Sequence, residues 1–384
     1  FLYFIGACAS WRMDITNIVF GVAVAATAFT FVSETGVEAP GRRWAAVMAL
    51  LASVVAISEI LGHLLHYRRR TQQRYVIRIL MMVPIYAVDS LWGFFDRSHS
   101  GLIDVARDTY ESFVIYNFFH LLLDLNGGVA GTVEYWRARK PTMPHMFPLR
   151  GHMKLDQSAI SLWRFFMIQY VLVSPACTIA TYVLTSAGEY DEDSWSVENA
   201  HLYIALIRCV SVTFAFTALL YFYLATKYNI HDMNPTGKFL SIKAVVFLGC
   251  WQGVAISVAE YFGVFPEDAV RRFLFRPEDP VHPAAAVAAL ENWLVILEMF
   301  GAVAAHHFVF SYKGFPKAAD EPETEAGYIS PARTGGRRMQ VPRAEPTLLE
   351  NIIHACALTD VADQAAHASR DAATDRRWHG AGRS

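Results

Sequence analysis

Long apolar runs separated by short polar segments make up most of this chain. A helix needs about 20 consecutive apolar residues to cross the roughly 30 Å hydrocarbon core of a bilayer. Seven runs reach that length: 44–66, 74–95, 105–125, 160–184, 202–226, 239–263 and 285–310. The pattern therefore predicts an all-α, polytopic membrane protein with a seven-transmembrane-helix bundle over residues 44–315.

An eighth apolar run, residues 15–32, is rich in Ala and Thr and lies at the short limit for a span. It is compatible with a membrane-crossing helix, a signal-type segment or a lumenal helix, so residues 1–43 form an N-terminal segment with a candidate extra helix. Because the chain starts at Phe1 and not at Met, we expect a fragment. Its opening FLYFIGACAS is either the end of a signal peptide or the remains of an upstream apolar segment.

The loops between the runs differ in charge, and this predicts an orientation. Basic residues near helix ends favour the cytoplasmic side. The loops after the first, third, fifth and seventh runs are basic (HYRRRTQQR, EYWRARKP, KYNIHDMNPTGK and SYKGFPK), whereas the intervening loops are acidic or balanced. We therefore expect the N-terminus outside the cell or in a lumen and the C-terminus in the cytosol. The membrane is the plasma membrane or an endomembrane, such as that of a vacuole or endosome.

The chain after the last run changes character. Residues 316–384 are charged, Ala-rich and Arg-rich and have little to bury, which predicts a mostly disordered cytoplasmic tail. Within TLLENIIHACAL (347–358), apolar residues recur at helical spacing: Leu348, Leu349, Ile352, Ile353 and Ala357. This stretch is compatible with a short amphipathic helix that binds a partner or lies on the membrane, and with a transient helix in a flexible tail.

The run QRYVIRILMMVPIYAVDSLW carries an arginine, a proline and an acid, which lipid penalises unless protein or water covers them. We expect Arg78 near the cytoplasmic boundary, a kink at Pro84 and Asp89 on the outer side. At about 1.5 Å per residue, Asp89 and Glu111 both fall roughly 6 Å outside the midplane. Arg208 is the nearest candidate counter-charge. Two interpretations stay open, a structural ion pair between helices and a site that meets a solute.

Further polar residues lie within the runs. Glu298, Gln252 and Asn117 fall near the centre, and Glu59, His120 and Lys243 fall on the cytoplasmic side. Each alone is compatible with a hydrogen-bonded packing role, but together they predict a polar path across the bundle. The candidate substrate pathway is Glu59, Asp89, Glu111, Asn117, His120, Lys243, Gln252 and Glu298, with Arg208 as the structural counter-charge.

Histidines near the cytoplasmic ends of two runs suggest another reading. Glu59, His63 and His66 form an ExxxHxxH pattern on one helix side, which is a metal-binding arrangement for an intramembrane enzyme. Helical spacing alone also produces such patterns, and no further ligand set is evident, so we predict no metal. His306 and His307 lie at the inner end of the last run, where we expect solvation at the interface.

Composition agrees with a membrane protein and disfavours several other classes. The chain of 384 residues is 54% hydrophobic and 18% charged, whereas soluble domains have about 25% charged residues. A net charge of -2 argues against nucleic-acid binding, which uses a basic face. Five cysteines without CxxC spacing indicate neither a disulfide framework nor a zinc site. No nucleotide-binding or hydrolase motif stands in a meaningful context, so we predict no enzyme activity, catalytic residue or cofactor.

Several blocks of the sequence resemble one membrane-protein family. VPIYAVDS, ESFVIYNFF, IKAVVFLGCWQG and ENWLVILEMFGAVAAHHFVFSYK occur in this order within residues 44–315. They are similar to segments of the transmembrane protein 184 and organic solute transporter alpha-subunit family. The resemblance implies a seven-helix membrane protein with an outside N-terminus. Animal members carry a cysteine-rich lipidation stretch between the third and fourth spans, but ARKPTMPHMFPLRGHMK has no cysteine, so that feature does not carry over.

The resemblance and the polar path together predict a transporter-like protein that facilitates movement of amphipathic organic solutes across a membrane. The organic solute transporter branch implies a small single-span partner subunit, and a homo-oligomer is the alternative. The other expected contacts are an organic solute or lipid-like ligand and membrane lipids, without nucleic acid. The competing hypothesis is a membrane receptor or vesicle-trafficking factor that acts through its cytoplasmic tail.

Overall fold

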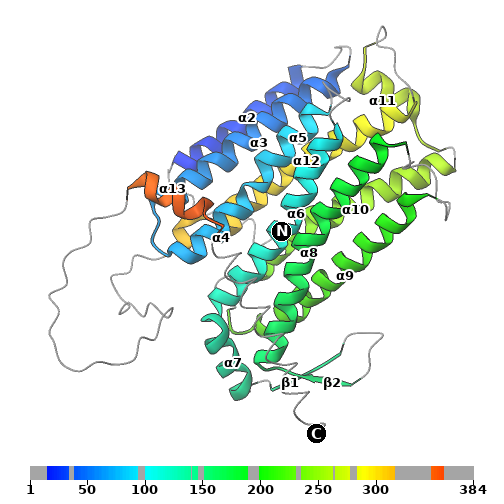
Figure 1. The fold of residues 1–384 in the computed structure, drawn as a ribbon. Helices are drawn as coiled ribbons and strands as arrows, with labels where there is room; N and C mark the ends of the chain where they lie inside the picture. Colours follow the sequence, from blue (N-terminus) through cyan, green and yellow to red (C-terminus); the bar gives the residue numbers. More distant parts are fainter. Residues whose placement is uncertain are drawn as a thin grey trace.

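The computed structural model describes residues 15–33, 39–93, 100–139, 141–145, 151–188, 199–230, 235–262, 264–276, 283–315 and 347–358. Within these residues the protein is an elongated bundle of helices with a small hairpin at one end (Figure 1). The long helices are α2 (Ile15–Ser33), α3 (Pro40–Leu65), α6 (Ser100–Leu125), α8 (Gln157–Ser186), α9 (Ala200–Thr226), α10 (Pro235–Tyr261) and α12 (Pro283–Val309). The shorter elements are α4 (Arg70–Leu80), α5 (Met82–Trp92), α7 (Gly128–Arg139), β1 (Thr142–Pro144), β2 (His152–Lys154), α11 (Glu267–Leu274), η2 (Tyr312–Gly314) and α13 (Leu348–Cys356).

The described helices include several that can cross a membrane. Five segments are long and apolar enough: Pro40–Leu65, Arg70–Trp92, Gln157–Ala187, Ala200–Thr226 and Ala286–Gly314. A sixth arises if Arg107–Leu125 and Gly128–Arg139, which are bent by 62°, count as one span. Each predicted apolar run contains a helix, including the run occupied by α10. The prediction of a helical membrane protein is confirmed, and seven crossings stay a prediction.

The second predicted span is divided into α4 and α5 at Met81. Pro84 has no N–H to donate to the carbonyl of Leu80, four residues earlier, and α4 ends at Leu80. Helical bonding resumes where Ile85 N donates to Met81 O at 3.3 Å. The expected irregularity at Pro84 therefore occurs three residues before the proline.

One end of the bundle gathers basic loops, and we call it the basic end. The loops after α3, α9 and α12 carry arginine or lysine there. Arg68 Nη1, after α3, donates to the carbonyl of Phe315, after α12 (2.9 Å), and Asn229, after α9, donates to Asn126 at the end of α6 (2.9 Å). Figure 1 places α4, α7, α13 and the hairpin at the same end.

A sharp bend at the basic end separates α6 from α7. Gly127 and Gly128 have φ of 80° and 70°, a left-handed conformation that glycine adopts without strain. Beyond the bend, the fully buried Trp136 donates from Nε1 to the carbonyl of Ala225 in α9 (3.2 Å). The short antiparallel hairpin β1–β2 follows, with Met143 opposite Met153. Within the described residues, this hairpin is the departure from the all-α prediction.

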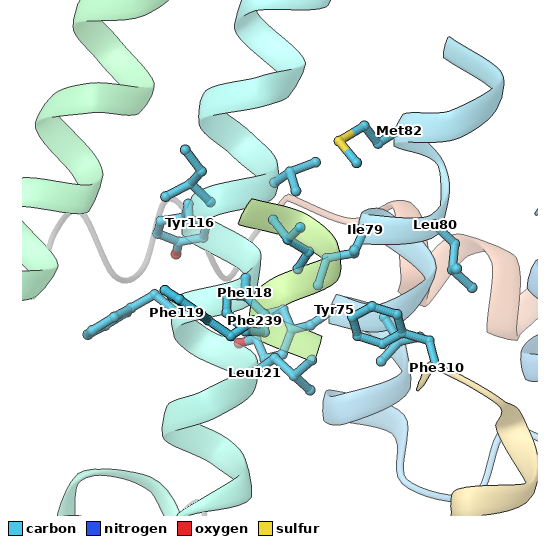
Figure 2. Packing of buried hydrophobic residues seen from close by; sticks show 14 of the residues in the cluster. Tyr75, Ile79, Leu80, Met82, Tyr116, Phe118, Phe119, Leu121, Phe239 and Phe310 are labelled. Carbon is cyan, nitrogen blue, oxygen red and sulfur yellow. The ribbon is translucent and has the colours of Figure 1, made fainter. Parts of the chain in front are cut away.

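Aromatic residues dominate the core toward the basic end, where four chain segments converge (Figure 2). The buried side chains come from α4, α6, α10 and the residue after α12: Tyr75, Ile79, Phe118, Phe119, Phe239 and Phe310. One face of α3 does not take part in this core and is exposed instead. Large apolar side chains stay exposed there at spacings of three and four: Leu50, Val54, Ile57, Leu61 and Leu65. Such a stripe on one helix face is suited to contact with lipid.

Residues 15–33 form α2, which packs along α3. Thr16 lies beside Gly62 near the end of α3, and Phe20 stacks on His307 of α12 with ring centroids 4.6 Å apart. Residue 15 therefore lies at the basic end, whereas α3 begins at the opposite end, so a cytosolic basic end gives the outside position predicted for the N-terminus to the start of α3 and not to residue 15. The three alternatives for this segment, a membrane-crossing helix, a signal-type segment and a lumenal helix, stay open.

The tail predictions are covered only in part. The opening FLYFIGACAS and residues 316–346 and 359–384 lie outside the described residues. The predicted amphipathic stretch forms α13, which begins with a capping box. In this box, Glu350 N donates to Thr347 Oγ1 (3.3 Å) and Thr347 N donates to Glu350 Oε2 (3.0 Å).

Candidate functional site

Arg208 belongs to a group of polar side chains from α6, α8 and α9. Its guanidinium pairs with the Asp108 carboxylate and donates from Nη2 to Thr178 Oγ1 (2.6 Å). Thr178 in turn donates to Asp108 Oδ2 (3.3 Å), and Ser174 donates to the Asp108 carbonyl (3.1 Å). We call Asp108, Thr178 and Arg208 the Arg208 cluster. It joins three helices through a charge pair, so both charges have partners within an apolar bundle.

The Arg208 cluster is not sealed. The Arg208 side chain is 40% exposed and the Asp108 side chain 19% exposed. The Nε–H of Arg208 is buried and has no hydrogen-bond partner among the described residues, so the exposed part of the guanidinium lies elsewhere on the group. A guanidinium presents its donors in a rigid fork that matches carboxylate, sulfate or phosphate. The cluster is therefore equipped to receive an anionic group beside Asp108.

Polar and aromatic pairs follow one another along the α8–α9 interface, from the Arg208 cluster toward the basic end. Gln169 and Ser211 exchange hydrogen bonds, with Nε2 donating to the Ser211 carbonyl (3.0 Å) and the Ser211 hydroxyl donating to Oε1 (2.9 Å). One turn further, Phe166 and Phe214 stack with centroids 5.1 Å apart. From the Arg208 cluster toward the basic end, the side chains at this interface are therefore first charged, then polar and uncharged, and then aromatic. The interface is polar at one end and apolar at the other.

Asp89 and Glu111 have different partners from those expected. Asp89 of α5, with a side chain only 7% exposed, pairs with Arg107 of α6 (3.4 Å). Glu111 lies close to Tyr170 of α8. Arg208 lies near Glu111 but forms its ion pair with Asp108, one turn earlier on α6.

Arg107 and Asp108 were missed because they lie near the start of the third apolar run, where charges are normally solvated. The available signal was their position one turn before Glu111 on the same helix, since residues three and four apart share a face.

Glu59 lies at the interface of α3 with α12. His307 Nδ1 donates to Glu59 Oε1 at 2.6 Å, and the two side chains are 5% and 2% exposed. The prediction that His306 and His307 are solvated was wrong, because both are buried. The cause is tertiary packing, since Phe20 covers His307 and Phe310 packs edge-on against His306.

The ExxxHxxH pattern is not assembled as a metal site. His63 Nε2 donates to the Phe310 carbonyl (2.7 Å), while its Nδ1 accepts from Gln73 (3.2 Å). His66 Nδ1 bonds the carbonyl of Gly62 in its own helix (3.0 Å). In the part of the chain that the structure describes, no group of three or more His, Cys, Asp or Glu side chains is placed to hold a metal ion.

Asn117 and His120 share the buried face of α6 but have different surroundings. Asn117 Oδ1 accepts from Nη1 of Arg78 (3.1 Å), and Asn117 Nδ2 donates to the Phe113 carbonyl (2.6 Å). His120 lies among aromatic rings, with the Tyr116 and Tyr75 centroids 4.4 and 6.1 Å from its own. Arg78 was expected near the cytoplasmic boundary, yet its side chain is buried because α13 covers it.

The remaining pathway candidates lie on α10 and α12. Glu298 and Gln252 are half-buried. The side chain of Lys243 lies outside the described part of the structure. Among the described side chains, the candidates are distributed over separate interfaces: α3–α12, α5–α6, α6–α8–α9 and α4–α6. A continuous path across the bundle therefore stays a prediction.

Comparison with known proteins identifies the family. No solved structure matches the chain. The family model described as "Organic solute transporter Ostalpha" matches residues 43–315, from the start of α3 to the end of η2, and leaves α2 and α13 outside the match. The match covers the Arg208 cluster, the Asp89–Arg107 pair and the Glu59–His307 pair, and it indicates an integral membrane protein with a solute-transporter-like role. The chain therefore belongs to the organic solute transporter alpha-subunit family.

Proposed function

We propose that this protein facilitates the movement of amphipathic organic anions across a membrane, with the anionic group received at Arg208. The observation that carries this is the Arg208 cluster, a partly exposed guanidinium within apolar helices. A charge in such a place is costly unless it has a function or a partner. Asp108 supplies a partner, and the 40% exposure of the Arg208 side chain leaves part of the guanidinium open to a ligand.

The chemistry of the α8–α9 interface supports an amphipathic solute. A sulfate or carboxylate at Arg208 places the apolar body of the solute toward Gln169 and the stacked Phe166 and Phe214. Small-molecule sites are mostly apolar, with a few polar groups that orient the ligand. A steroid-like or bile-acid-like skeleton fits this order of surfaces.

The topology of the proposal follows from charge and family. We place the basic end in the cytosol, because positive loops stay there, and we count α10 among seven crossings. Since the family is one of transporter subunits, we include a small single-span partner, with a homo-oligomer as the alternative. Asp89, Glu111, Asn117, His120, Gln252, Glu298, Glu59 and Lys243 are proposed to line the route.

The test is saturable uptake of pregnenolone sulfate into liposomes that contain the purified protein, with and without a candidate partner subunit. Arg208→Gln removes the anion-binding fork, so we expect KM to rise about 10- to 100-fold, the effect of losing a hydrogen bond to a charged group. Arg208→Lys keeps the charge but not the forked pair of donors, so we expect its KM to lie between those of the wild type and Arg208→Gln. Leu206→Val, on the exposed side of the same helix, is the matched control.

A double variant separates solute binding from a structural role. Arg208→Gln alone leaves Asp108 unpaired, whereas Asp108→Asn with Arg208→Gln removes both charges together. A structural ion pair predicts that the double variant recovers uptake, and a solute site predicts that it does not. Absence of saturable uptake of any steroid, bile-acid or lipid-like anion by the wild type refutes the proposal.

A further inference from the structure

The tail helix α13 is docked on the bundle at the basic end, against α4 and α3 (Figure 1). Asn351 is buried and donates from Nδ2 to the carbonyl of Leu64 in the last turn of α3 (3.0 Å). Burial raises the pKa of Tyr67 to about 12, and its hydroxyl is hydrogen-bonded to His354 Nδ1 (3.0 Å). These contacts orient the C-terminal end of α13 toward Arg78.

Arg78 binds the end of α13 through one edge of its guanidinium. Nε donates to the carbonyl of Ala355 (3.1 Å) and Nη2 donates to the carbonyl of Ala357. The other nitrogen, Nη1, donates to Asn117, and the guanidinium lies 5.4 Å from the centroid of the Phe113 ring. Nε and Nη2 point in parallel, which is the arrangement that binds the two oxygens of a carboxylate or sulfate.

The carbonyl oxygens of Ala355 and Ala357 bind the Nε and Nη2 edge of Arg78 in the positions that two oxygens of an anion would take. The last carbonyls of a helix lack intrahelical partners and carry the negative end of the helix dipole. They therefore offer two oxygens with partial negative charge to the edge of Arg78. The side chain of Arg78 is only 5% exposed while α13 is docked, so the helix also closes access to it.

The docking of α13 depends on hydrogen bonds more than on apolar burial. The residues that it buries against the bundle are Asn351 and Ala355. Its larger apolar side chains point away, with Leu349 and Ile353 66% and 60% exposed. Burial of large apolar side chains is the usual source of strong helix docking. Because α13 lacks it, the hydrogen bonds with Arg78, Leu64 and Tyr67 are the main contacts that hold the helix in place.

We propose that Arg78 is a binding site for the oxyanion group of an amphipathic molecule, and that α13 is an autoinhibitory segment that occupies this site with its terminal carbonyls. The ligand class is a carboxylate, sulfate or phosphate on an apolar body, from an organic solute or a phospholipid. Arg78 lies within the family match and α13 lies beyond it, so the site belongs to the bundle and the regulator to the tail. This proposal depends on the proposed function in one respect, namely that a transported solute is one source of the anion.

The test measures binding of pregnenolone sulfate to the full-length protein in phosphatidylcholine nanodiscs, together with amide hydrogen exchange of residues 348–356. Asn351→Ala weakens docking without touching Arg78, so we expect binding to tighten by about threefold to tenfold, the value of one hydrogen bond. Arg78→Lys is expected to weaken binding and to abolish the effect of Asn351→Ala. Leu349→Ala, on the outward face of α13, is the matched control and leaves binding unchanged.

Hydrogen exchange identifies the release of the helix and the source of the anion. We expect the probe to speed exchange of residues 348–356 in the wild type. Faster exchange on adding phosphatidylserine alone, without the probe, assigns the anion to a lipid headgroup and also supports the proposal.

Equal probe binding by the wild type and Asn351→Ala overturns the autoinhibitory role, and unchanged binding by Arg78→Lys overturns the site. Both results are independent of uptake, so they are distinguishable from failure of the transport proposal.

Discussion

The buried pair of Glu59 and His307 makes a quantitative prediction about stability. The perturbation is Glu59→Ala, which removes the carboxylate that accepts from His307 Nδ1 at 2.6 Å. Both side chains are almost fully buried, at 2% and 5% exposure, so solvent cannot replace the lost partner. Removing one member of a buried hydrogen-bonded pair costs about 3–5 kcal/mol. We expect a loss of that size in the free energy of unfolding.

Three further variants separate the contributions of Glu59 and His307 to this loss of stability. Glu59→Gln keeps an oxygen that accepts from His307, so the expected loss is about 1–2 kcal/mol. His307→Phe keeps a flat ring against Phe20 but leaves the carboxylate unpaired, so the expected loss is again about 3–5 kcal/mol. Glu59→Leu combined with His307→Phe replaces both polar groups by apolar ones, and this variant should be close to the wild type.

The assay is unfolding of the detergent-solubilised protein by titration with sodium dodecyl sulfate, followed by tryptophan fluorescence. A double-mutant cycle of Glu59→Leu and His307→Phe should give a coupling of about 6–10 kcal/mol, because each change that leaves one partner unpaired costs about 3–5 kcal/mol and the double variant costs almost nothing. Ile57→Ala, on the exposed face of the same helix, is the control. A coupling below about 0.5 kcal/mol, the scatter of additive pairs, would refute the reasoning that the pair holds α3 against α12.

Three further substitutions test the packing of two buried contacts and the break between α4 and α5. Trp136→Phe removes the indole donor to the end of α9, so we expect a loss of about 1–3 kcal/mol in the same unfolding assay, against little change for the exposed Trp92→Phe. Gly62→Ala places a methyl carbon 2.8 Å from the tyrosine ring of η2 and should cost about 1–3 kcal/mol, whereas Gly301→Ala, with nothing within 4 Å, should not. Pro84→Ala restores a backbone donor, so amide exchange at residues 81–85 should slow, and unchanged exchange would contradict our account of the break between α4 and α5.

The helices were predictable because their signals are local. A bilayer fixes the length of an apolar run, so every predicted run contains a helix. The missing N–H of Pro84 marked the break, although its position at Met81 depended on which carbonyl lost its donor. TLLENIIHACAL carries its own capping box and forms α13 as a local unit. The direction of the bend at Gly127 and Gly128 was not predictable from the glycines alone, because it depends on what α7 packs against.

The partners of the polar residues were not predictable from spacing alone. The position along the helix axis placed Asp89 and Glu111 at the same depth in the membrane. The direction in which each side chain leaves its helix decides which neighbour it contacts, and spacing alone does not give that direction. Asp89 therefore pairs with Arg107, and Arg208 with Asp108. Burial of His307 required a ring from α2, far away in the sequence.

The contact between Arg78 and α13 is made by main-chain oxygens, and this bears on how the tail tolerates change. The carbonyls of Ala355 and Ala357 would be present whatever side chains stood at those two positions. What the contact requires is the place where the helix stops and the distance of that stop from the bundle. Substitutions at these two positions therefore leave the contact in place, whereas a change in where the helix ends moves both carbonyls away from Arg78.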